Sequence, residues 1–381
     1  MKLRTTIYYY LVWITPVLML ACATRDDAQS EPAVHWEASP RLSLGVALGD
    51  PALEFGNVVG AAKLSDGTLA IADYMHSEVR LFSPDGEHIR SVGGKGDGPG
   101  EFRSVVRLAR TAGDTLIAGG VTRMSVFSLS GSHEGDLPLT WKGIATPPWR
   151  METAWPLSTN MFLVKLLPTG ASERPTGVMR RSPELYLVTR GDSVVVDPLG
   201  QYGGLEQLNY EAAGRTETAF PLFAAFTYPA VSDGYFAIGD TDADSVLVYK
   251  TSSGERSWVQ VPLKPKAVSQ EAWENAKAIA CLDASEVEPC QRGLLNLPIE
   301  RETTVFDGIA IDSLGTLWLK TPSLERDTVA EWLVVNLAGQ AKGRVSLPSD
   351  ARITQVGADY VVVIRRDSLG VSRVVEYAVS K

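Results

Sequence analysis

Apolar and polar residues alternate along most of the chain, in short runs separated by turns that contain Gly, Asp or Ser. A period of two places one side of an extended segment in a core, so each run predicts a β-strand. The clearest example spans 58–92, with turns at Ser65-Asp66-Gly67 and Ser83-Pro84-Asp85-Gly86. This segment predicts a meander of four antiparallel strands.

The same four-strand pattern recurs along the chain. Turn glycines such as Gly67 and Gly113 lie about 45 residues apart, a period typical of the blades of a β-propeller. Five further copies are expected at 102–139, 154–199, 222–261, 305–347 and 353–379. The last copy supplies only three strands. A closed ring leaves no free sheet edge, so we expect segment 41–48 to add the missing outer strand, antiparallel to its partner. The predicted fold is all-β, a six-bladed propeller over residues 41–381 closed by an N-terminal strand.

One segment has a helical period instead. Within 269–280, Ala272, Trp273, Ala276 and Ile279 form one apolar stripe, and Ser269 is placed to cap the N-terminus. We predict a short helix in an insertion at about 266–301, between the fourth and fifth blades.

The same insertion contains two of the three cysteines, Cys281 and Cys290. In an oxidising compartment two neighbouring cysteines favour a disulfide. A metal site at this pair would need further ligands, and no His lies near either Cys. We therefore predict the disulfide.

The N-terminus has the layout of a secretory signal. Lys2 and Arg4 precede an apolar run at 7–21, which is shorter than the roughly 20 residues of a comfortable membrane span. The segment Met19-Leu20-Ala21-Cys22 resembles the lipobox of bacterial lipoproteins. The resemblance implies that residues 1–21 are removed, that Cys22 is lipidated and that 22–40 form a linker. An ordinary signal peptide with a chance Cys is the alternative.

The position after Cys22 is Ala23, which under enterobacterial sorting rules favours the outer membrane. The expected location is the cell envelope, with the protein held by lipid at the outer membrane and facing the periplasm. The formal net charge is −9 and no Lys/Arg run occurs. Such a chain repels phosphate backbones, so nucleic acid is not an expected partner.

Two segments carry a family resemblance. Segment 71–86, followed by the Gly-rich stretch 93–102, resembles an NHL repeat, and 307–319 resembles a strand pair of bacterial six-bladed propeller lipoproteins. The resemblance implies a propeller lipoprotein of the NHL-like group. It supports the fold rather than an activity, because propellers host many functions.

Two candidate sites have simpler explanations. The glycines of 93–100 could cradle a phosphate, but no Gly-Lys-Ser/Thr follows and Glu101 would repel an anion, so we interpret them as a crossover between blades. His76 near Asp73 could act as a general base, but no nucleophile with a supporting motif accompanies it. No catalytic residue is assigned.

A metal site comes from resemblance alone. Gluconolactonase-like propellers hold a divalent cation in the central channel, and this similarity implies Asn57, Asp307 and Gln355 as oxygen ligands for Ca²⁺ or Mg²⁺. The alternative is an ordinary polar channel lining without a cofactor. Among the aromatics of the middle blades, Trp149 and Tyr202 are expected at an exposed face that suits a sugar or a protein loop.

The leading functional hypothesis is an envelope-anchored binding or scaffolding propeller without catalytic activity, whose partner is an envelope protein or a carbohydrate. The alternative is a metal-assisted lactonase or lyase of the gluconolactonase-like or NHL-like type.

Overall fold

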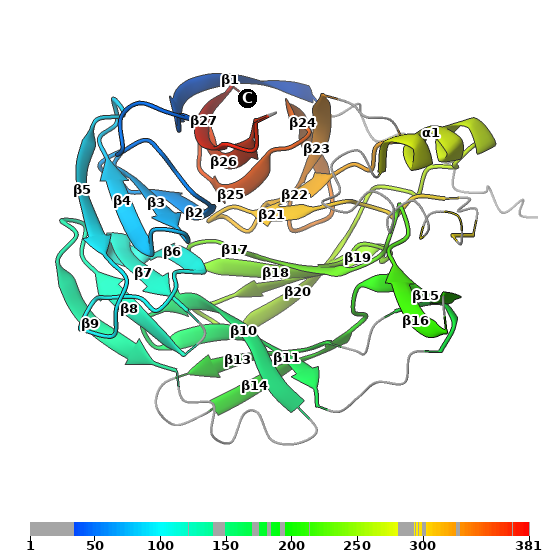
Figure 1. Ribbon diagram of the computed structural model, residues 1–381, viewed down its shortest axis with the longest axis horizontal. Helices are drawn as coiled ribbons and strands as arrows, with labels where there is room; N and C mark the ends of the chain where they lie inside the picture. The colour runs from blue at the N-terminus through cyan, green and yellow to red at the C-terminus, as the bar shows by residue number, and fades with distance from the viewer. Residues whose placement is uncertain are drawn as a thin grey trace, which may run out of the picture. The chain divides into compact units, whose positions relative to one another are not determined.

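β-Strands make up nearly all of the regular structure, and successive strands pair antiparallel into sheets (Figure 1). The computed structural model describes residues 34–120, 122–139, 149–169, 175–180, 184–190, 195–212, 214–280, 293, 295, 297–298, 302–324, 328–367 and 369–380. The predicted signal peptide and the residues Cys22, Cys281 and Cys290 lie outside this part.

All strands except β12, β15 and β16 fall into six groups, called sheets 1 to 6 below and each given from the strand nearest the centre (Figure 1). Sheet 1 contains β2 (Val58–Lys63), β3 (Leu69–Asp73), β4 (Glu78–Phe82) and β5 (His88–Gly93). Sheet 2 contains β6 (Arg107–Thr111), β7 (Thr115–Gly119), β8 (Arg123–Phe127) and β9 (His133–Pro138). Sheet 3 contains β10 (Trp149–Ser158), β11 (Met161–Pro168), β13 (Glu184–Arg190) and β14 (Val195–Tyr202).

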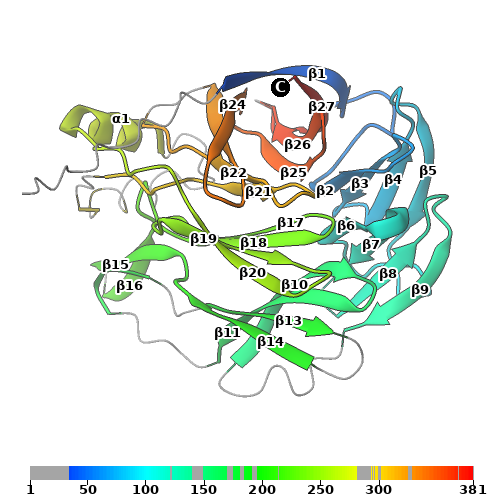
Figure 2. The ribbon, with the colours of Figure 1, turned by 180° about the vertical axis from the view of Figure 1, so that it is seen from behind.

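Sheet 4 contains β17 (Thr227–Val231), β18 (Tyr235–Asp240), β19 (Ser245–Lys250) and β20 (Glu255–Gln260). Sheet 5 contains β21 (Ile309–Ile311), β22 (Leu317–Lys320), β23 (Val329–Val335) and β24 (Ala341–Pro348). Sheet 6 contains β25 (Arg352–Val356), β26 (Tyr360–Arg366), β27 (Ser372–Ser380) and the N-terminal strand β1 (Val34–Leu44). Figure 2 shows the same order from behind.

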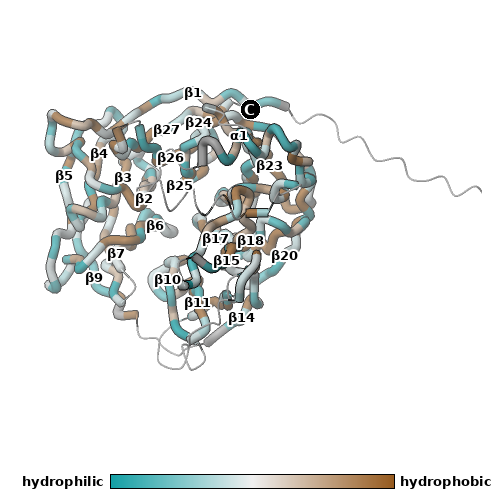
Figure 3. The backbone as a smooth tube through the Cα atoms, turned by 45° about the vertical axis from the view of Figure 1, so that its right-hand side comes forward, coloured by the Kyte–Doolittle hydropathy of each residue, from teal (hydrophilic) through white to brown (hydrophobic). Residues whose placement is uncertain are grey.

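Burial changes from strand to strand within a sheet. All five residues of β3 are buried, whereas β5 is exposed along nearly its whole length. In Figure 3 the tube is brown along β7 and teal along much of β9. In these two sheets the polar surface therefore lies on the outer strands β5 and β9, and β3 and β7 lie in the core.

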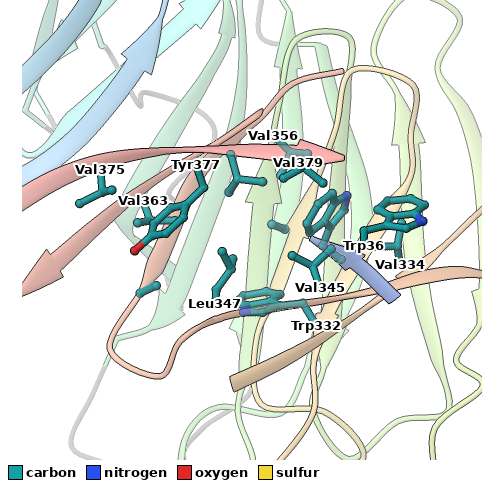
Figure 4. Close-up of a cluster of buried hydrophobic side chains, with 14 residues drawn as sticks. Trp36, Trp332, Val334, Val345, Leu347, Val356, Val363, Val375, Tyr377 and Val379 are labelled. Carbon is teal, nitrogen blue, oxygen red and sulfur yellow. The ribbon is translucent and has the colours of Figure 1, made fainter. Parts of the chain in front are cut away.

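Six clusters of buried apolar side chains lie between consecutive sheets, including one between sheet 6 and sheet 1. The cluster between sheets 5 and 6 contains Trp36, Trp332, Val345, Leu347 and Tyr377 (Figure 4). Each sheet is thus wedged against both neighbours, the arrangement of a β-propeller.

β1 joins the last two sheets. Its residues Glu37 to Leu44 pair antiparallel with β27, and Val34, His35 and Trp36 pair parallel with β24 of sheet 5. Sheets 5 and 6 consequently form one eight-stranded sheet. The antiparallel pairing was predicted, but at 41–48 instead of 34–44. The strand ends earlier because Gly45 has a φ of +125°, outside the range of an extended strand.

The insertion and its surroundings differ in part from the prediction. The helix is confirmed as α1 (Gln270–Ala280), capped by Ser269, whose Oγ accepts a hydrogen bond from the Ala272 amide at 3.1 Å. A three-stranded sheet, β12 (Gly177–Arg180), β15 (Glu206–Ala212) and β16 (Arg215–Ala219), was not predicted. These strands are short and rich in polar residues, and packing of Trp273 on Leu208 and Tyr210 supports them. None of the helices in the described ranges is long and apolar enough to span a membrane.

Candidate functional site

The first strands of all six sheets line a central cavity of about 390 Å³, here called the channel. Its wall includes residues of β2, β6, β10, β17, β21 and β25. Small-molecule sites in proteins occupy roughly 300–1,000 Å³ and are mostly apolar with a few convergent polar groups. Val59, Ala109, Ala230, Ile309 and Ile353 supply the apolar part of this wall, and polar groups supply about as much of its surface.

Small residues let the inner strands approach one another. At Gly60 on β2, a Cβ atom would lie 2.9 Å from the Cβ of Leu108 on β6. Real Cβ atoms do not approach this closely, so any larger residue would push sheets 1 and 2 apart. Gly60 therefore sets the spacing of the channel wall at this point.

Four charged residues line the channel: Arg107, Arg110, Arg352 and Asp233. The charge of Arg110 is compensated, because its Nε lies 2.6 Å from Oδ1 of Asp114. Arg107 and Arg352 form no ion pair with any carboxylate in the part of the chain that the structure describes. Asp233 belongs to the turn after β17, whereas Arg107 and Arg352 each begin an inner strand.

Arg107 is held in place but incompletely satisfied. Its Nη2 donates to Thr153 Oγ1 at 3.0 Å and its Nη1 to the Val106 carbonyl at 3.1 Å. Its guanidinium lies over the Trp155 ring, 5.0 Å from the centroid. Its Nε is buried and has no acceptor among the described residues. Burial lowers the pKa of Arg107, the charge of Arg352 lowers it further, and Glu152 acts in the opposite direction.

Arg352 reaches the same part of the wall from sheet 6. Its Nη2 donates to the Val59 carbonyl at 3.2 Å on β2. The Arg352 side chain is exposed to water. Burial lowers the pKa of Arg352, and the neighbouring charge of Arg366 lowers it further. An arginine still stays protonated at neutral pH, so both positive charges persist.

The predicted metal ligands are not gathered in the channel. Only Gln355 lines it, and its side-chain amide bonds to both the amide and the carbonyl of Lys63, which ties sheet 6 to sheet 1. Asn57 accepts a hydrogen bond from Arg366 at 2.7 Å, and Asp307 lies 3.5 Å from Lys320. No group of three His, Cys, Asp or Glu suited to a metal occurs among the residues described. The metal site stays a prediction.

Trp149 and Tyr202 are both half-buried. Trp149 packs on the cluster between sheets 2 and 3, and the Tyr202 ring lies 5.5 Å from that of Tyr186. Burial raises the pKa of Tyr202 to about 12. A role for either residue in ligand binding remains a prediction. The most exposed tryptophan that the structure describes is Trp258, which sequence reasoning did not select.

At the two sites that the sequence analysis gave simpler explanations, the His76–Asp73 pair and the Gly-rich stretch 93–100, the polar groups bond to neighbouring residues. Asp73 accepts hydrogen bonds from the amides of Gly56, Asn57 and Met75, and it lies 2.7 Å from His76 Nδ1. In the Gly-rich crossover, Glu101 Oε2 accepts the Gly98 amide at 2.8 Å. The Gly98 amide is therefore already hydrogen-bonded to a carboxylate of the protein itself, instead of being free to bind a phosphate.

Arg107 and Arg352 were missed because a single arginine in an alternating strand is indistinguishable from a surface residue. The one signal in the sequence is their shared position, each at the start of the first strand of a repeat.

The comparisons with known proteins give likeness of structure only. No protein-family model matches the chain, and no curated protein matches it in sequence. A member of the DUF4221 family from Bacteroides vulgatus is similar with a TM-score of 0.47 and 12% identity, covering 91% of this chain and 99% of that chain. The calcium-binding protein regucalcin from Agrobacterium tumefaciens gives 0.37 and 11%, covering 91% and 97%. Virginiamycin B lyase from Staphylococcus aureus gives 0.36 and 11%, covering 88% and 87%. These likenesses assign no function to this chain.

Proposed function

We propose that this chain is a six-bladed β-propeller that binds a small ligand in its central channel, as a lipid-anchored protein of the cell envelope. The observation that carries the proposal is the channel itself, because all six inner strands contribute to its wall. The six sheets and the six clusters between them support the blade count, and β1 supplies the fourth strand of the last blade.

The envelope location rests on the sequence. Lys2 and Arg4 before an apolar run and the lipobox-like segment ending at Cys22 favour export and lipidation. Two or more acyl chains would hold the protein stably at a membrane. A disulfide between Cys281 and Cys290 fits the same oxidising compartment.

Binding is favoured over catalysis by the charges in the channel. An arginine that stays protonated can hold a ligand but cannot exchange protons with it at neutral pH. The alternative, a metal-assisted lactonase or lyase, needs Asn57, Asp307 and Gln355 to share one cation. Only Gln355 lines the channel, so the contacts favour the binding hypothesis.

The proposal is tested by a substitution that fills the channel with a large side chain. Ala109 lines it and belongs to none of the buried clusters, so Ala109→Phe occupies lumen rather than core. Ala338, in the exposed turn after β23, is the control site for Ala338→Phe. Ligands that raise the melting temperature of the wild type in a metabolite screen should stabilise the control equally and Ala109→Phe much less. At a hundredfold excess over Kd the stabilisation lost is about 2.7 kcal/mol. Equal stabilisation of all three proteins would place binding outside the channel.

A further inference from the structure

The channel has an uncompensated positive charge at one place on its wall. Arg107 is the first residue of β6, Arg352 is the first of β25, and both strands contact β2, which lies between them. Arg352 donates to the Val59 carbonyl on β2, and the next residue, Gly60, lies against Leu108 of β6. The Arg107 guanidinium itself lies against Thr153 and Trp155 of β10, within reach of the charge of Arg352.

Nearby acidic groups form no ion pair with Arg107 or Arg352 among the described residues. Glu152 is 3.2 Å from Lys165, which also lies 2.7 Å from Glu184, so these three groups keep one negative charge that acts on Arg107 from a distance. Asp307 is engaged with Lys320, and Asp233 lies in the turn after β17. Arg366 adds a further positive charge close to Arg352 and, among the described residues, donates to the amide oxygen of Asn57 without forming an ion pair.

Two like charges in a partly desolvated place are unfavourable unless an anion joins them. Arginine donors match the oxygens of carboxylates and phosphates, and such charge-assisted hydrogen bonds are stronger than neutral ones. Thr153 and Trp155 fix the position of the Arg107 guanidinium, whose Nε is buried and has no acceptor among the described residues. Part of an anion site is thereby preorganised.

We infer that the channel binds a small organic anion, with its negative group between Arg107 and Arg352 and an apolar body along the aliphatic wall. This inference rests on the proposed function. The volume and the aliphatic wall favour an organic acid over a bare inorganic ion. Carboxylate and phosphate share the required chemistry.

The experiment measures binding by calorimetry at low salt with three probes of one shape: benzoate, phenyl phosphate and the neutral benzamide. We expect at least one of the two anions to bind about tenfold or more tightly than benzamide, because hydrogen bonds between charged groups supply the difference. Raising the salt concentration should weaken anion binding and leave benzamide unaffected.

Arg352→Gln is the main variant, since the side chain is accessible to water and its loss leaves no core cavity. It should weaken anion binding by about tenfold or more and leave benzamide unchanged. Arg107→Gln should do the same. Because Arg352→Gln removes one of two repelling charges at an exposed side chain, this ligand-free variant should melt no lower than the wild type. Arg365→Gln is the control, because Arg365 pairs with Asp350 and does not line the channel.

Failure of this inference differs from failure of the proposed function. Anion binding that is unchanged in Arg352→Gln, or no binding of either anion at millimolar concentration, overturns the inference. If ligands found in the screen are neutral and are still blocked by Ala109→Phe, the channel remains the binding site and only the charge class is wrong.

Discussion

Glu376 is a buried carboxylate where three strands meet, with 4% of its surface exposed. Its Oε1 lies 2.7 Å from Nζ of Lys63 on β2 and 3.4 Å from Nη1 of Arg41 on β1. Glu376 itself belongs to β27, so one side chain links the N-terminal strand, sheet 6 and sheet 1. Breaking a buried pair is costly because the remaining charge loses its partner.

We therefore expect Glu376→Gln to lower the free energy of unfolding by about 2 kcal/mol. Urea denaturation with an unchanged m-value measures the loss. The matched control is Glu331→Gln, which breaks a more exposed pair with Arg344 and should cost less than about 1 kcal/mol. Equal effects at the two sites would contradict a special role for Glu376.

Asp73 makes stability depend on pH. Burial would raise the pKa of its carboxyl, but hydrogen bonds from the Asn57 amide, His76 and the Gly56 amide outweigh it and hold the pKa below the ordinary 3.8. A carboxyl with a lowered folded pKa stabilises the protein above its unfolded pKa, and this contribution is lost as the pH falls through the folded pKa.

The wild type should therefore lose stability as the pH falls below about 4. Asp73→Asn should be less stable at neutral pH and should lose less on further acidification. Denaturation curves at several pH values from neutral to strongly acidic compare the two slopes. Asp114 and Asp136, whose pKa values are also lowered, keep part of the slope in the variant. Parallel curves would show that Asp73 does not titrate in this range.

At the scale of elements, β1 depends on one large side chain. Trp36 is 9% exposed, and its ring lies 6.2 Å from that of Trp318 in sheet 5. The strand opposite provides room through Gly343, where a Cβ atom would fall 2.3 Å from Cε2 of Trp36. The absence of a side chain at Gly343 thus makes room for the Trp36 ring.

Trp36→Ala should destabilise the protein by about 3–5 kcal/mol, the usual cost of removing a buried tryptophan. Trp258→Ala, at a residue that is 60% exposed, should stay within about 0.5 kcal/mol of the wild type. Thermal melting of both variants decides. If Trp36→Ala melts like the wild type, β1 does not hold sheets 5 and 6 together.

The segment after α1 carries the disulfide prediction. Cys281 follows the last residue of α1, and bonding to Cys290 would place the two Cα atoms within about 7 Å. Thiol labelling of the denatured, unreduced mature protein should find neither cysteine accessible. Labelling after reduction is the control. Two thiols labelled without reduction would refute the bridge.

The repeat pattern predicted the strands because alternation reflects burial within each sheet, as in β2 to β5. The lining of the channel, in contrast, depends on how strands from different repeats are placed relative to one another. Asn57 and Asp307 lie just before β2 and β21, so their side chains bond to Arg366 and Lys320 outside the channel wall. Gln355, one residue before the end of β25, does line it. Whether a residue lines the channel or lies at its edge thus depends on a shift of one or two residues along a strand. Strand boundaries predicted from sequence are not accurate enough to resolve such a shift.

For the whole molecule, the anchor prediction concerns Cys22. Cys22→Ser removes the thiol to which lipid is attached, so the protein should leave the membrane fraction or persist as an uncleaved precursor. Detergent partitioning and the mass of the N-terminal peptide measure both outcomes. Ala23→Ser is the control that should keep the anchor. Partitioning of Cys22→Ser identical to that of the wild type would contradict lipidation.

The β1–β27 ladder also sets an order of events during synthesis. It pairs Glu37 with Ser380, so β1 meets its partner only after every residue between them has emerged. Contacts between residues this distant form slowly, and until then the partner strand has an unpaired edge that can join another chain. Slow elongation or slow export would lengthen this interval, so the yield of the folded protein should depend on the rate at which its last strand is delivered.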